Sequence, residues 1–600
     1  MKRRDVLKSG LGVLGTNSLA RAFGPAFGLC PILTTSANAS GSVPVVDIHC
    51  HVFNAHDLPI FGFVKNVLFR EAKEHKKSLG SIEKIFFQFL QVASKWIHEK
   101  AYSAEDEEKF LDAMSKRQKT RPTAAEIQKR EEKLLTEFFI EIKNGYKNMD
   151  RSKLKRAQRL WGWRGPLYIM DKLRRNLFPE RFPRRKTNRD AIRQTLNEIK
   201  PHHMAKRVFE KDTKTSRLFK WVMLLTRYRF QIVEELSRFH KNGVQLVTPA
   251  LVDYDMWLDD VAPSSIAAQV NVLDKISKQY HSTNSEKNVP LHGFVAFDPL
   301  REAFFRMGAK EAKFSSFEVV KDAILNKGFV GVKMYPPMGF FPLENKAKLK
   351  FKRLPNHVKK LARKLGKDHA LTKTLDDVLD DYYVWCRDFG VSILAHATNS
   401  NGAGKGYSRR ADPLHWKAVT SKYPELNICL AHMGRFDEAI PSKKKPKPLE
   451  TETWEWHFAE LFEAEESAQI YCDLSYLLVP YRKHDDKTSG QYNYIVGRFK
   501  SLISKFPGIE NRILFGSDWI MLGTDAQVPD GSTEKSHLDF VIEFCKDVGL
   551  ADRIDEIFGQ NAIRFLGLDK DLQRGNRSRL LEYYGTSDRV AWLKDIPVNV

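Results

Sequence analysis

GVSILAHATN, residues 390–399, is a short run of β-branched and apolar residues that ends in a histidine. A run of this length and composition, bounded by glycine and polar residues, is typical of a buried strand. The same form returns in LNICLAHMG, residues 426–434. Two such runs with a helical stretch between them predict parallel strands joined by a crossover helix.

Similar runs recur along the second half of the chain. They are GVQLVTPALVDYD (243–255), LHGFVAFDPLR (291–301), GFVGVKMYPP (328–337), AQIYCDLSY (468–476) and RILFGSDWI (512–520). The intervening segments, such as 375–389 and 537–549, carry apolar residues at helical spacing. With VVDIHCHVF (45–53) near the start, the runs number eight. Eight strands separated by helices predict an α/β fold, the (β/α)8 TIM barrel, whose chemistry gathers at the carboxyl ends of its strands.

The long interval between the first two runs is the exception to this rhythm. Residues 53–240 hold amphipathic helical patterns and no convincing strand, so we expect a large helical insertion in the first βα loop, over or beside the barrel mouth. The predicted organisation is an export signal at 1–39, the first barrel strand at 44–52, the insertion at 53–240, the remaining barrel at 241–568 and a C-terminal tail at 569–600. The sequence does not indicate a role for the tail.

The first residues, MKRRDVLKSGLGVLG (1–15), resemble a twin-arginine export signal. Arg3 and Arg4 precede a small and apolar stretch, and Ala37 and Ala39 offer a cleavage site. We therefore expect a periplasmic or secreted protein, or a cytoplasmic one if this segment is only a basic tail. No later run reaches the roughly 18 uninterrupted apolar residues of a membrane-spanning helix, so none is expected in the mature chain.

Composition and charge are those of a globular protein with an uneven basic excess. Of 600 residues, 42% are apolar and the formal net charge is +24. Residues 151–189 hold 14 Lys and Arg against 2 Asp and Glu, interleaved with aromatic residues. This segment is either a helical cap with solvated charges or a contact for an anionic surface or acidic substrate. No nucleic-acid module is recognised, so nucleic acid is not an expected partner.

Cysteine usage does not suggest a disulfide framework. Cleavage of the signal would leave five cysteines, which are widely spaced and lie mostly in apolar runs. That pattern predicts buried thiols.

Histidines and charged residues fall where the predicted strands end. His49 and His51 are two residues apart, which places both imidazoles on one face of the first strand. The carboxyl ends of all barrel strands meet at one rim, so polar residues on several ends predict a metal site there. The residues at this rim are His49, His51, Lys333, His396, His432 and Asp518.

Together these motifs resemble the amidohydrolase superfamily, and specifically its Amidohydrolase 2 branch, which includes the aminocarboxymuconate semialdehyde decarboxylase type. The resemblance rests on DIHCH, GFVGVKMYPP, LAHATN, LAHMG, FGSDW and GQNAIRFLGL, and covers residues 44–51 and 240–568. It implies that one divalent metal, zinc in the first place and manganese as the alternative, is bound by His49, His51, His396 and Asp518.

The same resemblance implies the catalytic roles. His432 is either a second metal ligand or a general acid/base, and Asp518 takes the proton from water whose pKa the metal lowers toward about 7. The leading reaction is hydrolysis of an ester, lactone or amide in a small-molecule substrate. Non-oxidative decarboxylation of a carboxylated aromatic or muconate-like compound is the alternative, because the branch performs it with the same ligands. A third hypothesis, of another class, is a polyanion-binding protein on a barrel scaffold.

Other rim residues leave alternatives open. Lys333 is a carboxylated bridge between two metals, which alone would require a second metal, or else an ammonium that binds a substrate carboxylate or an ion-pair partner. Arg409, Arg410 and His415 lie in the Gly-rich, basic stretch 398–416, which is a substrate-contacting lid or a plain surface loop. Tyr335 follows Lys333 and lines a substrate channel or packs against the insertion.

Overall fold

Eight parallel strands organise the chain, and each falls within one of the eight predicted runs. The computed structural model describes residues 43–68, 70, 94–147, 200–210, 214–241, 243–282, 289–434, 450–464, 469–477, 490–524 and 536–598. The strands are β1 (Val46–Cys50), β2 (Leu246–Pro249), β3 (Phe294–Ala296), β4 (Gly331–Met334), β5 (Ser392–His396), β6 (Asn427–Ala431), β7 (Gln469–Asp473) and β8 (Ile513–Leu514). They are shorter than the apolar runs because the ends of those runs turn into loops and caps, as at Asp298, the N-cap of the helix after β3.

The strands follow one another around the molecule in sequence order. β1 pairs with β2, and β3 to β8 form one sheet with parallel neighbours throughout. Two parallel bridges, Val247 with Leu291 and Ala250 with Phe294, connect the β2 segment to the β3 segment. On the other side, Ile48 N donates to Phe515 O over 3.1 Å, which joins β1 to the segment after β8. This order confirms the predicted (β/α)8 class.

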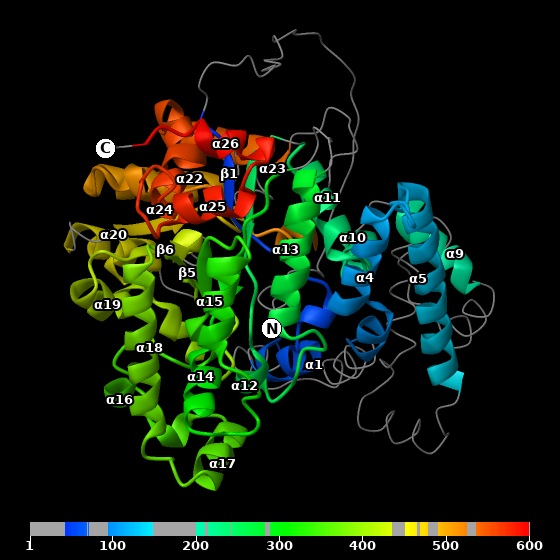
Figure 1. The fold of residues 1–600 in the computed structure, drawn as a ribbon, viewed down its shortest axis with the longest axis horizontal. Coiled ribbons are helices and arrows are strands. Elements are labelled where there is room, and N and C mark those ends of the chain that lie inside the picture. Colours follow the sequence, from blue (N-terminus) through cyan, green and yellow to red (C-terminus); the bar gives the residue numbers. More distant parts are fainter. Residues whose placement is uncertain are drawn as a thin grey trace.

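Helices fill the connections between strands and cover the sheet from outside (Figure 1). α18 shows why they pack there, since its buried Leu375, Val378, Leu379 and Tyr382 share one face at three- and four-residue spacing. From β2 onward the helices are α12 (Asp255–Leu258), α13 (Ile266–Ser282), α14 (Pro299–Arg306), α15 (Ser316–Asn326), α16 (Asn345–Lys348), α17 (Asn356–Lys364), α18 (Leu371–Asp388), α19 (Lys417–Lys422), α20 (Trp454–Ala464), α22 (Gly490–Lys505), α23 (His537–Asp547) and α24 (Asn561–Leu566).

The described residues between β1 and β2 form helices and no strand. Figure 1 shows α4, α5, α9 and α10 gathered on one side of the barrel. α5 buries Leu134, Leu135, Phe138 and Phe139 on one face. Among the described residues, the insertion contains α1 (Ile60–Phe63), α4 (Ala104–Ser115), α5 (Ala124–Lys147), α9 (Pro201–Glu210), α10 (Lys214–Leu224) and α11 (Arg229–Phe239), and residues 94–100 are helical as well. The basic stretch 151–189 lies outside the described residues.

A buried arginine ties the insertion together. The Arg229 guanidinium is 1% exposed and lies 3.0 Å from Glu107 Oε2, and its Nε donates to Asp57 Oδ2 over 2.8 Å. One cation thereby joins the first residues after β1 to α4 and α11. The insertion also reaches the barrel mouth, because Trp221 Nε1 donates to Ile520 O over 2.8 Å. Ile520 lies two residues after Asp518, so the described insertion lies beside the site predicted from sequence.

The C-terminal tail closes the opposite end of the barrel. α25 (Asn576–Tyr584) and α26 (Ala591–Lys594) follow α24, and Figure 1 shows them near β1, away from α17 at the mouth side. Leu580, Tyr584 and Leu593 belong to one apolar cluster with Leu246 and Phe294 of the barrel interior. The tail therefore forms a floor beneath the strands' amino ends, a role that the sequence did not reveal.

The cysteines of the described residues are all buried thiols. Cys50, Cys386, Cys429, Cys472 and Cys545 are free and buried, which confirms the prediction of buried thiols. Among the described helices, none has both the length and the apolar character required to traverse a bilayer. The predicted export signal, residues 1–39, lies outside the described residues.

Candidate metal centre

An irregularity in β1 aims His49 into the barrel. Asp47 pairs with Val247 but Cys50 pairs with Pro249, so β1 holds one extra residue between these two pairs. Ile48 belongs to the interior apolar cluster, and His49 also points inward, where it meets Asp473. Strict alternation would send one of these neighbours outward, and a bulge is the standard device for re-aiming a side chain beside an active site.

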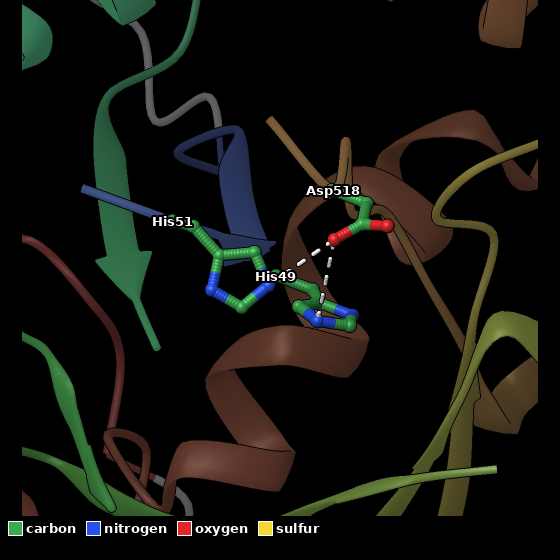
Figure 2. Close-up of side chains that lie close together, drawn as sticks. All are labelled: His49, His51 and Asp518. Carbon is green, nitrogen blue, oxygen red and sulfur yellow. Dashed lines mark ion pairs between the residues drawn. The ribbon is translucent and has the colours of Figure 1, made fainter. Parts of the chain in front are cut away.

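His49, His51 and Asp518 converge at the mouth (Figure 2). Asp518 Oδ1 lies 3.2 Å from His51 Nε2 and 3.9 Å from His49 Nε2. One ligand atom from each of the three residues lies within 4.8 Å of the others. The Asp518 side chain is 10% exposed, whereas that of Asp473 is fully buried.

In both imidazoles, Nδ1 lies at hydrogen-bonding distance from an oxygen atom that accepts. His51 Nδ1 lies 2.7 Å from Ala250 O, and His49 Nδ1 lies 3.0 Å from Asp473 Oδ2. Since these oxygens only accept, each Nδ1 carries the hydrogen, and in a neutral ring Nε2 then presents a lone pair. The lone pair of His51 Nε2 and the Asp518 carboxylate oxygen, 3.2 Å apart, repel unless a cation lies between them, whereas His49 Nε2 is met by Lys333 Nζ. Because nitrogen and carboxylate donors suit zinc, these residues fit a divalent metal.

Asp473 also begins a series of hydrogen bonds in which the donor and the acceptor of each bond can be assigned. Ser475 Oγ donates to Asp473 Oδ1, so it accepts from His432 Nδ1, which lies 2.8 Å away. His432 Nε2 then accepts from His396 Nδ1 over 3.1 Å. The series ends at Tyr335, whose hydroxyl lies 3.4 Å from His396 Nε2. The tautomers of both histidines therefore follow from one buried carboxylate.

His396 lies beside the metal centre, next to His432, and its role as a metal ligand stays a prediction. In the described part of the molecule, two groups of ligand atoms lie within 4.8 Å of one another: His49, His51 and Asp518, and His49, His432 and Asp473. His396 belongs to neither group and reaches the centre through His432. Its Nε2 lies 3.2 Å from Ser400 Oγ.

Several side chains of the centre have shifted pKa values. Burial would raise the pKa of the Asp473 carboxyl, but His49, His432 and the Ser475 hydrogen bond lower it on balance. Burial lowers the pKa of His432 to about 3. Burial also lowers the pKa of the Lys333 ammonium to about 8. Lys333 is 2% exposed, and its Nζ donates to His49 Nε2 over 3.0 Å. Within the described residues Lys333 has no carboxylate within ion-pair distance, so the ion-pair alternative has no partner there.

Backbone strain collects at the same place. Asp518 has φ 54°, His432 φ 72° and Met433 φ 41°, all in the left-handed region that non-glycine residues seldom adopt. Such strain gathers at functional sites, where the surrounding structure holds it in place.

Of the remaining rim residues, one lies at the metal centre and three line a separate pocket. Tyr335 stacks on His396 with ring centroids 4.2 Å apart and meets Tyr254 at 5.0 Å, so it lines the metal centre. Arg409, Arg410 and His415 instead line a separate pocket with Phe341 and Tyr407. No residue of the metal centre belongs to the lining of that pocket.

Sequence reasoning missed Asp473 and Ser475. Asp473 ends β7 in AQIYCDLSY, the position at which other strands carry the predicted ligands. The rule that selected His396 and Asp518 would have selected Asp473 as well. Gly516 was also missed: a Cβ added there would lie 2.9 Å from His49 Cβ, so only glycine leaves room for the imidazole.

The chain belongs to the amidohydrolase family. The family model described as Amidohydrolase (Amidohydro_2) matches residues 254–568, more than half of the chain. The resemblance predicted from the motifs is thereby confirmed. The protein is a metal-dependent enzyme of this superfamily, whose members include hydrolases and decarboxylases.

Several solved structures are similar to this chain. A 2,6-dihydroxybenzoate decarboxylase from Rhizobium is 14% identical, with 56% of this chain and 87% of that chain covered and a TM-score of 0.29. The 5-carboxyvanillate decarboxylase LigW from Sphingomonas paucimobilis is 12% identical, with 56% and 82% covered and a TM-score of 0.29. An amidohydrolase from Burkholderia multivorans with bound zinc is 12% identical, with 55% and 86% covered and a TM-score of 0.28. No curated protein matches the chain.

Proposed function

We propose that the protein is a hydrolase that uses water to cleave an ester, lactone or amide bond in a small-molecule substrate. The observation that carries this proposal is the convergence of two imidazole Nε2 atoms on the carboxylate of Asp518. When bound, a divalent metal, zinc in the first place and manganese as the alternative, supplies Lewis-acid polarisation and a lowered pKa for water.

The side chains of the centre have different roles in the proposed reaction. Asp518 accepts a proton at its carboxylate, because its side chain is 10% exposed whereas that of Asp473 is fully buried. His432 stays neutral at neutral pH, since burial lowers its pKa to about 3. Its Nδ1 is engaged by Ser475 and its Nε2 faces the other histidines, so it orients partners by hydrogen bonding without supplying a proton at neutral pH.

Decarboxylation is the second candidate, and the observation that favours it is Lys333. A buried ammonium without a carboxylate partner among the described residues is suited to hold a substrate carboxylate beside His49. A substrate bound in that way would present its carboxyl group to the metal centre, where carbon dioxide could leave.

The first experiment is metal content by mass spectrometry on the purified chain, with His49→Ala and Asp518→Ala. We expect about one equivalent of zinc or manganese in the wild type and its loss in both variants. The matched control is His369→Ala, because His369 is 99% exposed and its ion-pair partner is the neighbouring Asp368. Two equivalents would support a carboxylated, bridging Lys333, and a metal-free wild type after metal-replete preparation would overturn the proposal.

Turnover of the metal-loaded enzyme distinguishes the two reactions. Lactone, ester and amide panels are followed by acid release, and aromatic carboxylates by carbon dioxide release. Hydrolysis without carbon dioxide release supports the leading proposal. Carbon dioxide release that Lys333→Met abolishes, with metal content unchanged, supports the decarboxylase instead.

We also propose that the protein is exported, on the strength of Arg3 and Arg4 and the stretch that follows them. Replacing both arginines by lysine should retain the protein in the cytoplasmic fraction. An unchanged distribution between fractions would argue for a cytoplasmic enzyme with a basic N-terminal tail.

A further inference from the structure

A pocket separate from the metal centre lies between the loops that follow β4 and β5. Its volume is about 260 Å³, and the two loops contribute residues 341–353 and 405–415 to its walls. Its lining contains a histidine, two aromatic rings, a glycine and six cationic side chains. The cationic side chains are Lys348, Lys350, Arg353, Lys405, Arg409 and Arg410.

The positive charge of this pocket is largely uncompensated. Lys348 has a carboxylate partner, Glu344, at 2.6 Å. Among the described residues, the other five cations form no ion pair with a carboxylate. Asp412, the nearest acid along the second loop, is engaged by His457 at 2.8 Å. Five cations that converge without an acid repel one another, and a bound anion removes that repulsion.

Arg410 is the cation of the pocket that is buried and held in place by its neighbours. Its side chain is only 7% exposed, its guanidinium carbon lies 3.5 Å from the centre of the Tyr407 ring, and it donates to Gly339 O. Burial, together with the positive charge of Arg353, lowers the pKa of Arg410 to about 10. A buried guanidinium that stacks on an aromatic ring is held in a fixed orientation, which preorganises its remaining donors for a ligand.

The walls are also held in place by bonds between the two loops. Tyr407 OH donates to Arg353 O over 2.6 Å, and Ala403 N donates to Pro337 O over 3.0 Å. The cations are therefore brought together by backbone contacts and do not depend on a ligand for their arrangement.

We propose that this pocket is a binding site for a phosphate-bearing anion, distinct from the metal centre. A carboxylate carries one negative charge, whereas a diphosphate or phosphomonoester carries two or more and offers several oxygens in a small volume. Arginine forks match phosphate oxygens in pairs, and lysines add point charges around them. The volume of about 260 Å³ suits a group of this size better than a polymer.

Calorimetric titration of the full, metal-loaded chain with inorganic pyrophosphate at low salt tests this proposal. We expect one equivalent to bind and the affinity to fall roughly tenfold or more in the Lys405→Gln/Arg409→Gln double variant. Both of these residues are exposed, so the fold should survive. The matched control is Lys364→Gln, because Lys364 is 70% exposed and paired with Glu311. Glycerol phosphate and orthophosphate distinguish an esterified from a free ligand, and acetate should not compete.

Asp518→Ala separates this pocket from the metal centre. Pyrophosphate binding that persists in Asp518→Ala and weakens in the double variant assigns the ligand to the pocket. Binding lost in Asp518→Ala but unchanged in the double variant would place the anion at the metal centre and overturn the proposal. No measurable binding of any of the phosphates at low salt would overturn it as well.

Discussion

Asp473 Oδ2 lies 3.0 Å from His49 Nδ1, at the end of a strand 424 positions away in the sequence, and the two side chains are 0% and 1% exposed. This contact fixes the imidazole tautomer that leaves Nε2 as a lone-pair donor. Carboxylates that hold ligating histidines in this way raise the basicity of the ring and set its orientation. The metal centre therefore depends on a residue that does not itself need to touch the metal.

Asp473→Asn tests that dependence. The amide keeps the shape of the side chain but removes its charge, and we expect metal affinity to fall about 10- to 100-fold. Competition with a chelator of known affinity measures the change. Asp377→Asn, which alters an exposed acid paired with Lys373, is the control. Wild-type metal affinity in Asp473→Asn would show that His49 is oriented by other contacts.

Gly516→Ala makes a steric prediction for the same imidazole. The added methyl group would lie 2.9 Å from His49 Cβ and 3.2 Å from Ser475 Cβ, so one of these side chains must shift. We expect loss of bound metal and of turnover with the barrel still folded, measured by metal content and circular dichroism. Gly497→Ala is the matched control, because nothing lies within 4 Å of the added methyl group and alanine favours the helix interior. Full metal content in Gly516→Ala would contradict this packing argument.

The sequence predicted the barrel and the centre of the site for a simple reason. Buried strands of a parallel barrel are local apolar runs, so their order along the chain gives the architecture, and residues at their ends share a rim. His49, His51 and Asp518 could be placed by that reasoning alone. The extra residue in β1 could not, because a one-residue change of register leaves no mark in the composition of the strand.

Other features depend on contacts that no single stretch contains. The basic pocket combines Arg353 with Arg409 and Arg410, more than 50 positions apart, and only the fold brings these charges together. The floor formed by α25 and α26 was invisible for a similar reason. The apolar residues of the tail, such as Leu580 and Leu593, are few, and the surface that they cover is the amino end of strands far away in the chain.

Arg229 makes the insertion sensitive to a single substitution. Arg229→Met would leave Asp57 and Glu107 buried without their cation, each about 1% exposed or less, and we expect a loss of about 3–5 kcal/mol in the free energy of unfolding. Urea denaturation measures the loss. The variant Arg229→Met/Asp57→Asn/Glu107→Gln removes all three charges and should recover part of the stability. A loss below about 1 kcal/mol for the single variant would mean that water or rearrangement replaces the cation.

The barrel floor should respond to acid through His292. This imidazole is 1% exposed, its Nδ1 lies 2.8 Å from Gly328 O and its Nε2 lies 2.7 Å from the Tyr584 hydroxyl of α25. Burial lowers its pKa from 6.5 to about 4. The unfolded chain therefore binds this proton first as the pH falls. The contribution is fully present above pH 6.5 and declines as the pH falls through the window from 6.5 to about 4, where the loss amounts to about 3 kcal/mol.

Urea unfolding at pH 7, 5.5 and 4 checks this contribution against His292→Gln, which cannot take up the proton. Other groups also titrate in this range, so the informative quantity is the difference between wild type and variant at each pH. We expect the advantage of the wild type to shrink as the pH falls, whereas His369→Gln, at a fully solvated position, should follow the wild type throughout. A wild-type advantage that stays constant from pH 7 to pH 4 would show that the pKa of His292 is the same in the folded barrel as in the unfolded chain.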